Sequence, residues 1–233
     1  MRVGTSADEP PLDPGHLHRL RCGARRALVA LGLGACLLSS AASAAADHDR
    51  PPPSSSHFLQ YGVGITGEAL VAAEEVCPTD PCIMGSGGGL TIRAGYRSRG
   101  PWYVGGAYEF ARLDAANLIR LAILQQLRAE TRYYVGHGTR LYPYLGAGLG
   151  ATLYGNEWGY DTAGVAGSLG AGLEFQITSA TVVGAALFYR PLLLRGWSDS
   201  AGERRADGFL GFGFAHYLGI ELNFEIRDPL PRW

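Results

Sequence analysis

Apolar residues alternate with polar residues or glycine along most of the chain after residue 57. The alternation has a period of two and persists for about ten to fifteen residues before each break. Successive side chains of a β-strand point to opposite faces, so this period predicts strands that have one apolar and one polar face. Eight strands are predicted, over residues 58–67, 88–97, 101–111, 125–136, 140–155, 164–177, 181–195 and 208–226.

The breaks between the predicted strands alternate between short and long. Tight turns fall at 98–100, 137–139 and 178–180. Longer and more polar segments separate the other pairs of strands, at 68–87, 112–124, 156–163 and 196–207. Transmembrane barrels have short periplasmic turns and longer external loops. The pattern therefore predicts an all-β, antiparallel up-and-down barrel with both ends of the strand region in the periplasm.

The parity of the strands separates two faces. In the segment 101–111, Trp102, Val104 and Tyr108 share the apolar face, while glycine and alanine occupy the other. Aromatic residues near strand ends on the apolar face are typical of a membrane girdle; they are Trp102, Tyr133, Tyr189 and Phe224. The charged residues within strands lie on the glycine-bearing face; they are Arg93, Glu109, Arg128, Glu130, Arg132, Glu174, Arg190, Glu221 and Glu225.

A soluble, lipocalin-like barrel would show the same alternation with the apolar face inside. The length of the segments favours a membrane barrel, because strands of soluble proteins average about 5 to 6 residues. About 9 to 11 tilted residues are needed to cross a bilayer. The chain after residue 50 contains no apolar run of the roughly 18 residues that a transmembrane helix needs.

The first 44 residues have the three-part layout of a secretory signal peptide. Arg25 and Arg26 end a basic region, residues 27–38 are mostly apolar, and small residues follow with an A-x-A cleavage site at 42–44. Residues 45–57 are rich in proline and serine and are expected to form a flexible periplasmic lead-in. An alternative is a lipoprotein cleavage box at 33–36, which would place a lipid on Cys36.

Removal of the signal peptide leaves Cys77 and Cys82 as the cysteines of the mature chain. In an oxidising compartment two neighbouring cysteines favour a disulfide, here in the first external loop. The alternative is half of a metal site, although no second cysteine or histidine pair lies nearby in the sequence.

The composition excludes one class of partner. The formal net charge is −1 and charged residues make up 18% of the chain, without a basic stripe that could neutralise phosphates. Nucleic acid is therefore not expected as a partner.

The last predicted strand carries a motif of outer-membrane barrels. Residues 217–224 read YLGIELNF, in which Tyr217, Gly219, Leu222 and Phe224 match a terminal insertion signal. With the signal peptide and the strand count, residues 58–227 resemble the small OmpA/OmpX/OmpW-like barrels. The resemblance implies a place among outer-membrane lipids and insertion by the outer-membrane assembly machinery. The tail at 228–233 departs from the family, whose members usually end on the aromatic residue.

An eight-stranded barrel is only wide enough for its own side chains, which argues against a wide pore. The predicted function is therefore structural or surface-interacting, with a lumen plugged by paired charges. The predicted network consists of Arg93, Glu109, Arg128, Glu130, Arg132, Glu174 and Glu221. A narrow gated channel for ions or small hydrophobic solutes is the alternative.

Two other functions depend on particular residues. The histidines of the mature chain are His57, His137 and His216. A lipid A deacylase would place a serine two positions after the histidine, but His216 has none there and His137 lies in a predicted turn between two glycines, so no catalytic, cofactor or metal residue is predicted. Adhesion through external loops would use their aromatic residues, which are Trp158, Tyr160 and Trp197.

Two segments fit the strand pattern poorly. Residues 118–130 have apolar spacing that also suits a short amphipathic helix, so a later start of the fourth strand is left open. His216 falls on the lipid parity of the last strand, which suggests a bulge near Ala215.

Overall fold

The computed structural model describes residues 57–73, 75–77, 81–135, 140–157, 159–199 and 202–230. The predicted signal peptide and most of the predicted lead-in lie outside the described residues, as do Cys36, His137 and Trp158. No helix in the described ranges is long and apolar enough to cross a membrane.

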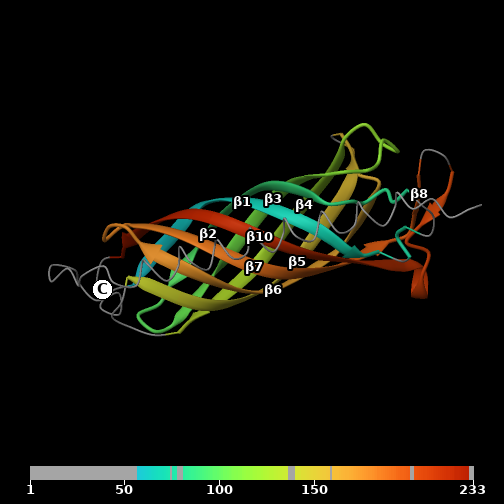
Figure 1. Ribbon diagram of the computed structural model, residues 1–233. Coiled ribbons are helices and arrows are strands. Elements are labelled where there is room, and N and C mark those ends of the chain that lie inside the picture. The colour runs from blue at the N-terminus through green and yellow to red at the C-terminus, as the bar shows by residue number, and fades with distance from the viewer. Residues whose placement is uncertain are drawn as a thin grey trace, which may run out of the picture. The chain divides into compact units, whose positions relative to one another are not determined.

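Eight antiparallel strands close into a barrel, as the alternation predicts (Figure 1). Consecutive strands are neighbours, and the first strand pairs with the last, with Phe58 opposite Pro229. The barrel strands are β1 (Phe58–Ala72), β2 (Gly87–Arg97), β3 (Trp102–Leu113), β4 (Ala122–Tyr134), β5 (Leu141–Asn156), β6 (Thr162–Gln176), β7 (Thr181–Arg195) and β10 (Phe212–Pro229).

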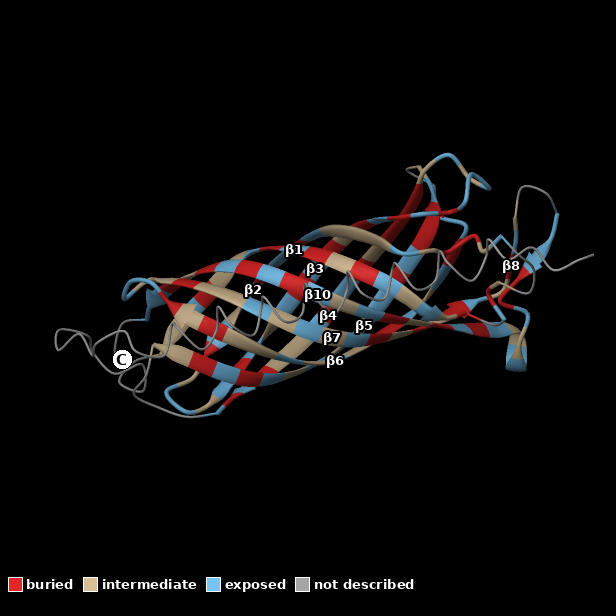
Figure 2. Ribbon diagram, viewed as in Figure 1, coloured by how far each residue is buried: buried red, intermediate tan, exposed pale blue. Residues whose placement is uncertain are grey.

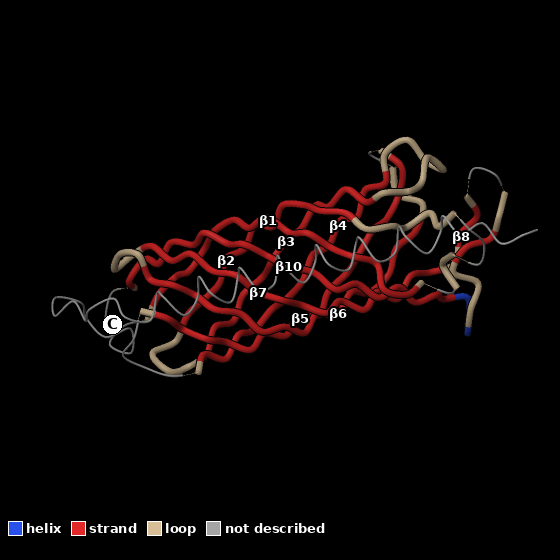
Figure 3. Tube along the Cα trace, viewed as in Figure 1, coloured by secondary structure: helices blue, strands red, loops and turns tan. Residues whose placement is uncertain are grey.

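The two ends of the barrel differ. The short turns and the described chain ends His57 and Leu230 lie at one end, which we call the periplasmic end. The long connections lie at the external end, where β8 (Trp197–Ser198) and β9 (Arg204–Arg205) form a small hairpin. A 3₁₀ turn, η3 (Phe209–Gly211), follows this hairpin and is the helical segment drawn at that end in Figure 3.

Strand boundaries at the external end differ from the predicted ones. β4 begins at Ala122, so the later start and the helix over 118–130 were wrong. Three consecutive residues, Ala122, Ile123 and Leu124, are buried, and Ala122 and Leu124 belong to the apolar cluster at the external end. β10 begins at Phe212 because Leu210 and Gly211 adopt positive φ values of 58° and 72°, which interrupt an extended chain.

Exposed and buried residues alternate along the strands between the two ends (Figure 2). The outward side chains are large and apolar; Ile65, Leu127, Leu149 and Leu187 are each more than 60% exposed. A soluble monomer rarely exposes so continuous an apolar surface. This outer face suits lipid, and the inward face holds the polar and charged residues.

The aromatic residues of the outer face mark its borders. Trp102 and Tyr133 lie opposite each other near the periplasmic end, with ring centroids 4.9 Å apart in an edge-to-face arrangement. Both rings are exposed, as expected for side chains that sit at a membrane–water boundary.

His216 lies on the outer face without a bulge near Ala215, so that expectation was wrong. The alternation of β10 continues through these residues, and the irregular pairing lies in β1 between Leu70 and Ala72, opposite them. The Tyr189 hydroxyl lies 2.7 Å from His216 Nδ1 and gives the imidazole a hydrogen-bond partner. The polar side chain of His216 therefore stays on the outer face and is accommodated there by its hydrogen bond with Tyr189.

Glycine on the inward face makes room for tyrosine rings. Gly95 and Gly105 are paired across β2 and β3, and the Tyr103 side chain lies over both. A Cβ atom at Gly105 would lie 2.5 Å from the Ala94 carbonyl oxygen and 2.5 Å from the Tyr103 hydroxyl. The glycine-rich inner face thus follows from the need to pack large rings into a narrow lumen.

We predict that Gly105→Ala lowers the free energy of unfolding by about 1–3 kcal/mol, because the new methyl group meets backbone that cannot yield. The neighbouring Gly106→Ala is the matched control, since its Cβ would meet nothing nearer than the Arg128 carbonyl oxygen at 3.6 Å. Urea unfolding of both refolded variants in lipid vesicles measures the difference. Equal losses in the two variants would contradict the packing argument.

Candidate functional site in the lumen and at the external mouth

The barrel strands direct charged side chains of both signs into the lumen. Among the described residues of these strands, the inward charges number six glutamates and six arginines, so their formal charges sum to zero. They are Glu68, Arg93, Arg97, Glu109, Arg128, Glu130, Arg132, Glu174, Arg190, Glu221, Glu225 and Arg227. We call this set the lumen network.

The part of the network nearer the external end joins four strands. Arg190 of β7 donates hydrogen bonds to Glu109 of β3 at 2.8 Å and to Glu68 of β1. Arg128 of β4 donates to the second oxygen of Glu109 at 2.8 Å and to Gln126 at 2.9 Å. Two arginines and two glutamates therefore form a chain of ion pairs across the barrel.

The part nearer the periplasmic end is larger. Arg132 donates to Glu174 at 2.8 Å and to Glu225 at 2.9 Å, so one guanidinium joins β4, β6 and β10. Arg227 donates to the other oxygen of Glu174 at 2.6 Å. Arg93 of β2 reaches the carboxylate of Glu221 at 2.7 Å. Every barrel strand except β5 contributes a charge to the lumen network.

Tyrosine rings fill the space beside these periplasmic-side charges. The Arg132 guanidinium carbon lies 5.1 Å from the Tyr103 ring centroid and 5.0 Å from that of Tyr144. Arg97 lies 3.2 Å from the centroid of Tyr134, whose hydroxyl donates to Glu174 at 2.5 Å. The aromatic faces therefore contact sides of the guanidinium groups that no described carboxylate contacts, and this cation–π attraction stabilises the arginine cations inside the barrel.

The structure brings the predicted network residues together in these two groups. Arg128 and Glu109 meet on the external side, while the other five predicted members lie on the periplasmic side. The predicted network lacked Glu68 and Arg227, which were placed at or beyond the ends of the predicted strands. It also lacked Arg190 and Glu225, although their parity placed them among the inward charges. Arg97 shares the parity of Arg93 and could have been included on that ground.

An apolar cluster closes the external end of the lumen. Its centre is the first external loop, in which Val76, Ile83 and Met84 are almost completely buried. They belong to one cluster with inward residues at the outer strand ends, including Leu192 and Leu194. We call residues 75–77 and 81–86 the cap.

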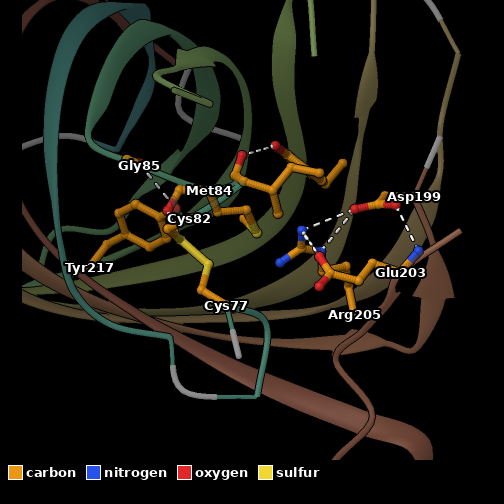
Figure 4. The surroundings of a disulfide bond; sticks show 10 residues. Cys77, Cys82, Met84, Gly85, Asp199, Glu203, Arg205 and Tyr217 are labelled. Carbon is orange, nitrogen blue, oxygen red and sulfur yellow. Dashed lines mark hydrogen bonds and ion pairs between the residues drawn. A yellow bond between two sulfur atoms is a disulfide. The ribbon is translucent and has the colours of Figure 1, made fainter. Parts of the chain in front are cut away.

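Several contacts hold the cap in the mouth. Cys77 and Cys82 form the predicted disulfide, which Figure 4 shows next to Met84. The Tyr154 hydroxyl donates to the Ile83 carbonyl oxygen at 2.5 Å, and the Tyr217 hydroxyl lies 3.4 Å from that of Gly85. The disulfide thus fixes a short loop whose apolar side chains enter the barrel.

Comparison with known proteins decides the family. A family model described as "Outer membrane protein beta-barrel domain" matches residues 33–191, which is more than half of the chain. The chain belongs to this outer-membrane β-barrel family. A search of curated proteins found no match.

Several solved structures are similar to this outer-membrane barrel. Neisserial surface protein A is 14% identical, with a TM-score of 0.44, and the match covers 71% of this chain and 96% of that one. OprG from Pseudomonas aeruginosa is 16% identical, with a TM-score of 0.41, and the match covers 75% of this chain and 97% of that one. The outer membrane protein AlkL is 14% identical, with a TM-score of 0.46, and the match covers 82% of this chain and 96% of that one.

The residues predicted as an insertion signal divide between the two faces of the outer-membrane barrel. Tyr217 and Gly219 face the lumen, where a Cβ at Gly219 would lie 2.3 Å from the Phe188 ring. Leu222 and Phe224 face outward and are exposed toward the lipid.

The loop aromatics differ in exposure. Tyr160 is 73% exposed, as expected for a surface residue. Trp197 was predicted to be exposed, which is wrong, because it is buried in the apolar cluster with its ring centroid 6.1 Å from that of Tyr154. Trp197 has the opposite parity to the inward Leu192 and Leu194, so its burial does not continue the alternation of β7; it belongs to the same apolar cluster as the loop residues Val76, Ile83 and Met84.

The two histidines in the described ranges lie on the outer face at opposite ends of the barrel. His57 stacks on Tyr96 near the periplasmic end, while His216 stacks on Tyr189 near the external end. In the described part of the chain, no group of three His, Cys, Asp or Glu side chains is arranged to hold a metal ion.

We predict that Arg132→Ala lowers the free energy of unfolding by about 3–5 kcal/mol, because it leaves the Glu174 and Glu225 carboxylates buried without their shared partner. Arg204→Ala is the control, since Arg204 is exposed and pairs with Asp207 only at 3.5 Å. Its effect should stay within about 0.5 kcal/mol. Denaturant unfolding in lipid vesicles measures both, and similar stability of the two variants would contradict a structural role for the network.

Proposed function

We propose that this outer-membrane protein acts as a closed barrel with a structural and surface-interaction role. Solutes do not pass through its resting lumen, and its contacts are made by the outer face and the external loops. The observation that carries the proposal is the filling of the lumen at two successive levels, by the cap and by the lumen network.

The two levels oppose different solutes. The cap places Val76, Ile83 and Met84 in the mouth, where an ion would lose its hydration without finding partners. The lumen network below it consists of paired charges, which a hydrophobic solute would have to separate. Because an eight-stranded barrel is only wide enough for side chains, little of the cross-section is left free beside either barrier.

Exposed apolar residues at the external end support a surface role. Phe209 is 85% exposed and Leu210 is 79% exposed. Their turn is held by hydrogen bonds from the Gly211 amide to the Gly208 carbonyl at 3.1 Å and from the Gly196 amide to the Gly211 carbonyl at 2.8 Å. A fixed turn that presents two apolar side chains is suited to contact with another surface.

The remaining partners follow from the outer face. Lipid surrounds the exposed apolar residues, and the outward Leu222 and Phe224 near the end of the last strand support recognition by the outer-membrane assembly machinery. A non-catalytic role is supported by His57 and His216, whose partners are tyrosines rather than a serine and an acid.

Planar-bilayer recording of the refolded mature protein tests the closed lumen. The wild type should show little steady conductance, whereas Arg128→Ala should show more, because the freed Glu109 carboxylate admits water beside it. Arg204→Ala in the external loop should stay as closed as the wild type. Large and stable wild-type channels would overturn the proposal in favour of a narrow gated channel.

The surface role predicts a change in cell-surface hydrophobicity. Cells that display the wild type should partition into hexadecane more than cells that display Phe209→Ser/Leu210→Ser, because the variant removes the two most exposed apolar side chains of the external end. Arg204→Ser at the same end is the control and should leave partitioning unchanged. Equal partitioning of the double variant and the wild type at matched surface amounts would argue against this contact surface.

A further inference from the structure

A cavity of about 60 Å³ lies within the lumen beside the network. On one side it is walled by small inward residues of three neighbouring strands, Gly146, Ser168, Gly170 and Ala186. One buried water molecule needs roughly 10–15 Å³ of such cavity volume. The cavity therefore has room for one small ion together with water.

The charged side chains that line the cavity are unequal in number. Four of them are arginines, Arg93, Arg128, Arg132 and Arg190, and two are glutamates, Glu130 and Glu221. The carboxylates that pair with these arginines elsewhere do not line the cavity; they are Glu68, Glu109, Glu174 and Glu225. Many ion pairs of these arginines are therefore formed away from the cavity, and the cavity wall carries more arginines than glutamates.

Within the described ranges, two of these arginines have a hydrogen-bond donor atom that lacks an acceptor. Arg128 and Arg190 are 3% and 1% exposed, and each uses Nη1 for its carboxylate partners. In the described part of the chain, the buried Nε of each has no hydrogen-bond acceptor. A buried donor without an acceptor is destabilising, so these two guanidinium groups have capacity for a further hydrogen-bond acceptor.

The pairing of strands is also interrupted at this wall. The pairing of β6 with β7 is interrupted at Gly167 and Ser168, which lie opposite Pro191 and Arg190 respectively. The nitrogen of Pro191 carries no hydrogen and cannot donate to the neighbouring strand. Ser168, with its hydroxyl donor, comes from this interrupted stretch and lines the cavity.

We propose that this cavity binds a small monovalent anion, such as chloride. The anion accepts hydrogen bonds from the guanidinium groups of Arg128 and Arg190, which line the cavity and whose carboxylate partners lie away from it. It would act as a bound counter-ion that links the two parts of the lumen network. The inference goes beyond the proposed function and does not depend on it, because an occupied cavity is compatible with either a closed or a gated lumen.

Thermal unfolding of the refolded mature chain in detergent tests the site. At equal ionic strength, sodium chloride should raise the unfolding midpoint by about 2–4 °C over sodium gluconate, whose anion is too large for the cavity. Gly146→Val should abolish this difference by filling the cavity, since the nearest atoms to a Cβ there are 3.7 Å away. Gly67→Val is the matched control on the outer face, where the nearest atom is 3.8 Å away, and it should keep the difference.

Equal midpoints of the wild type in the two salts would overturn the proposal and leave the cavity to water alone. A chloride effect that persists in Gly146→Val would also overturn it, because the ion would then bind elsewhere. If Gly146→Val does not fold, crystals of the wild type grown in bromide provide the test. An anomalous peak beside Arg128 and Arg190 supports the site, and no peak there overturns it.

Discussion

The ion pairs between inward arginines and glutamates are the interaction on which the rest of this barrel depends. Water cannot solvate twelve charges packed into a narrow lumen, so each charge needs an opposite partner inside it. Glu109 receives hydrogen bonds from both Arg128 and Arg190, and Glu174 from both Arg132 and Arg227. These shared carboxylates connect strands far apart in the sequence and thereby fix how the closed sheet is filled.

The outer face and the cap follow from the same arrangement of side chains as the ion pairs. Lipid can take up the exposed leucines and isoleucines because the alternation of the strands turns most of the charged residues inward. At the external end the inward residues become apolar, and the disulfide-bridged cap covers them. Lumen charge, outer lipid face and apolar mouth are therefore consequences of one inside-out arrangement.

The sequence could predict features that depend on local pattern. Alternation identified eight strands and the inward side of residues such as Glu109 and Arg132, and two neighbouring cysteines predicted the disulfide. It could not predict which charges meet, because Glu68 and Arg190 are separated by 122 residues and are joined only by the barrel's register. It also failed for Trp197, which is buried in an apolar cluster with residues of the first external loop whose position no period encodes.

A double-mutant cycle on Arg128 and Glu109 tests this account most directly, since their side chains pair at 2.8 Å inside the lumen. Arg128→Met, Glu109→Gln and the double variant keep the side-chain volumes similar while removing the charges. If the ion pair holds the lumen together, the double variant should be less destabilised than the sum of the single variants by about 1–3 kcal/mol. Additive effects, within about 0.5 kcal/mol, would contradict a lumen organised by paired charges.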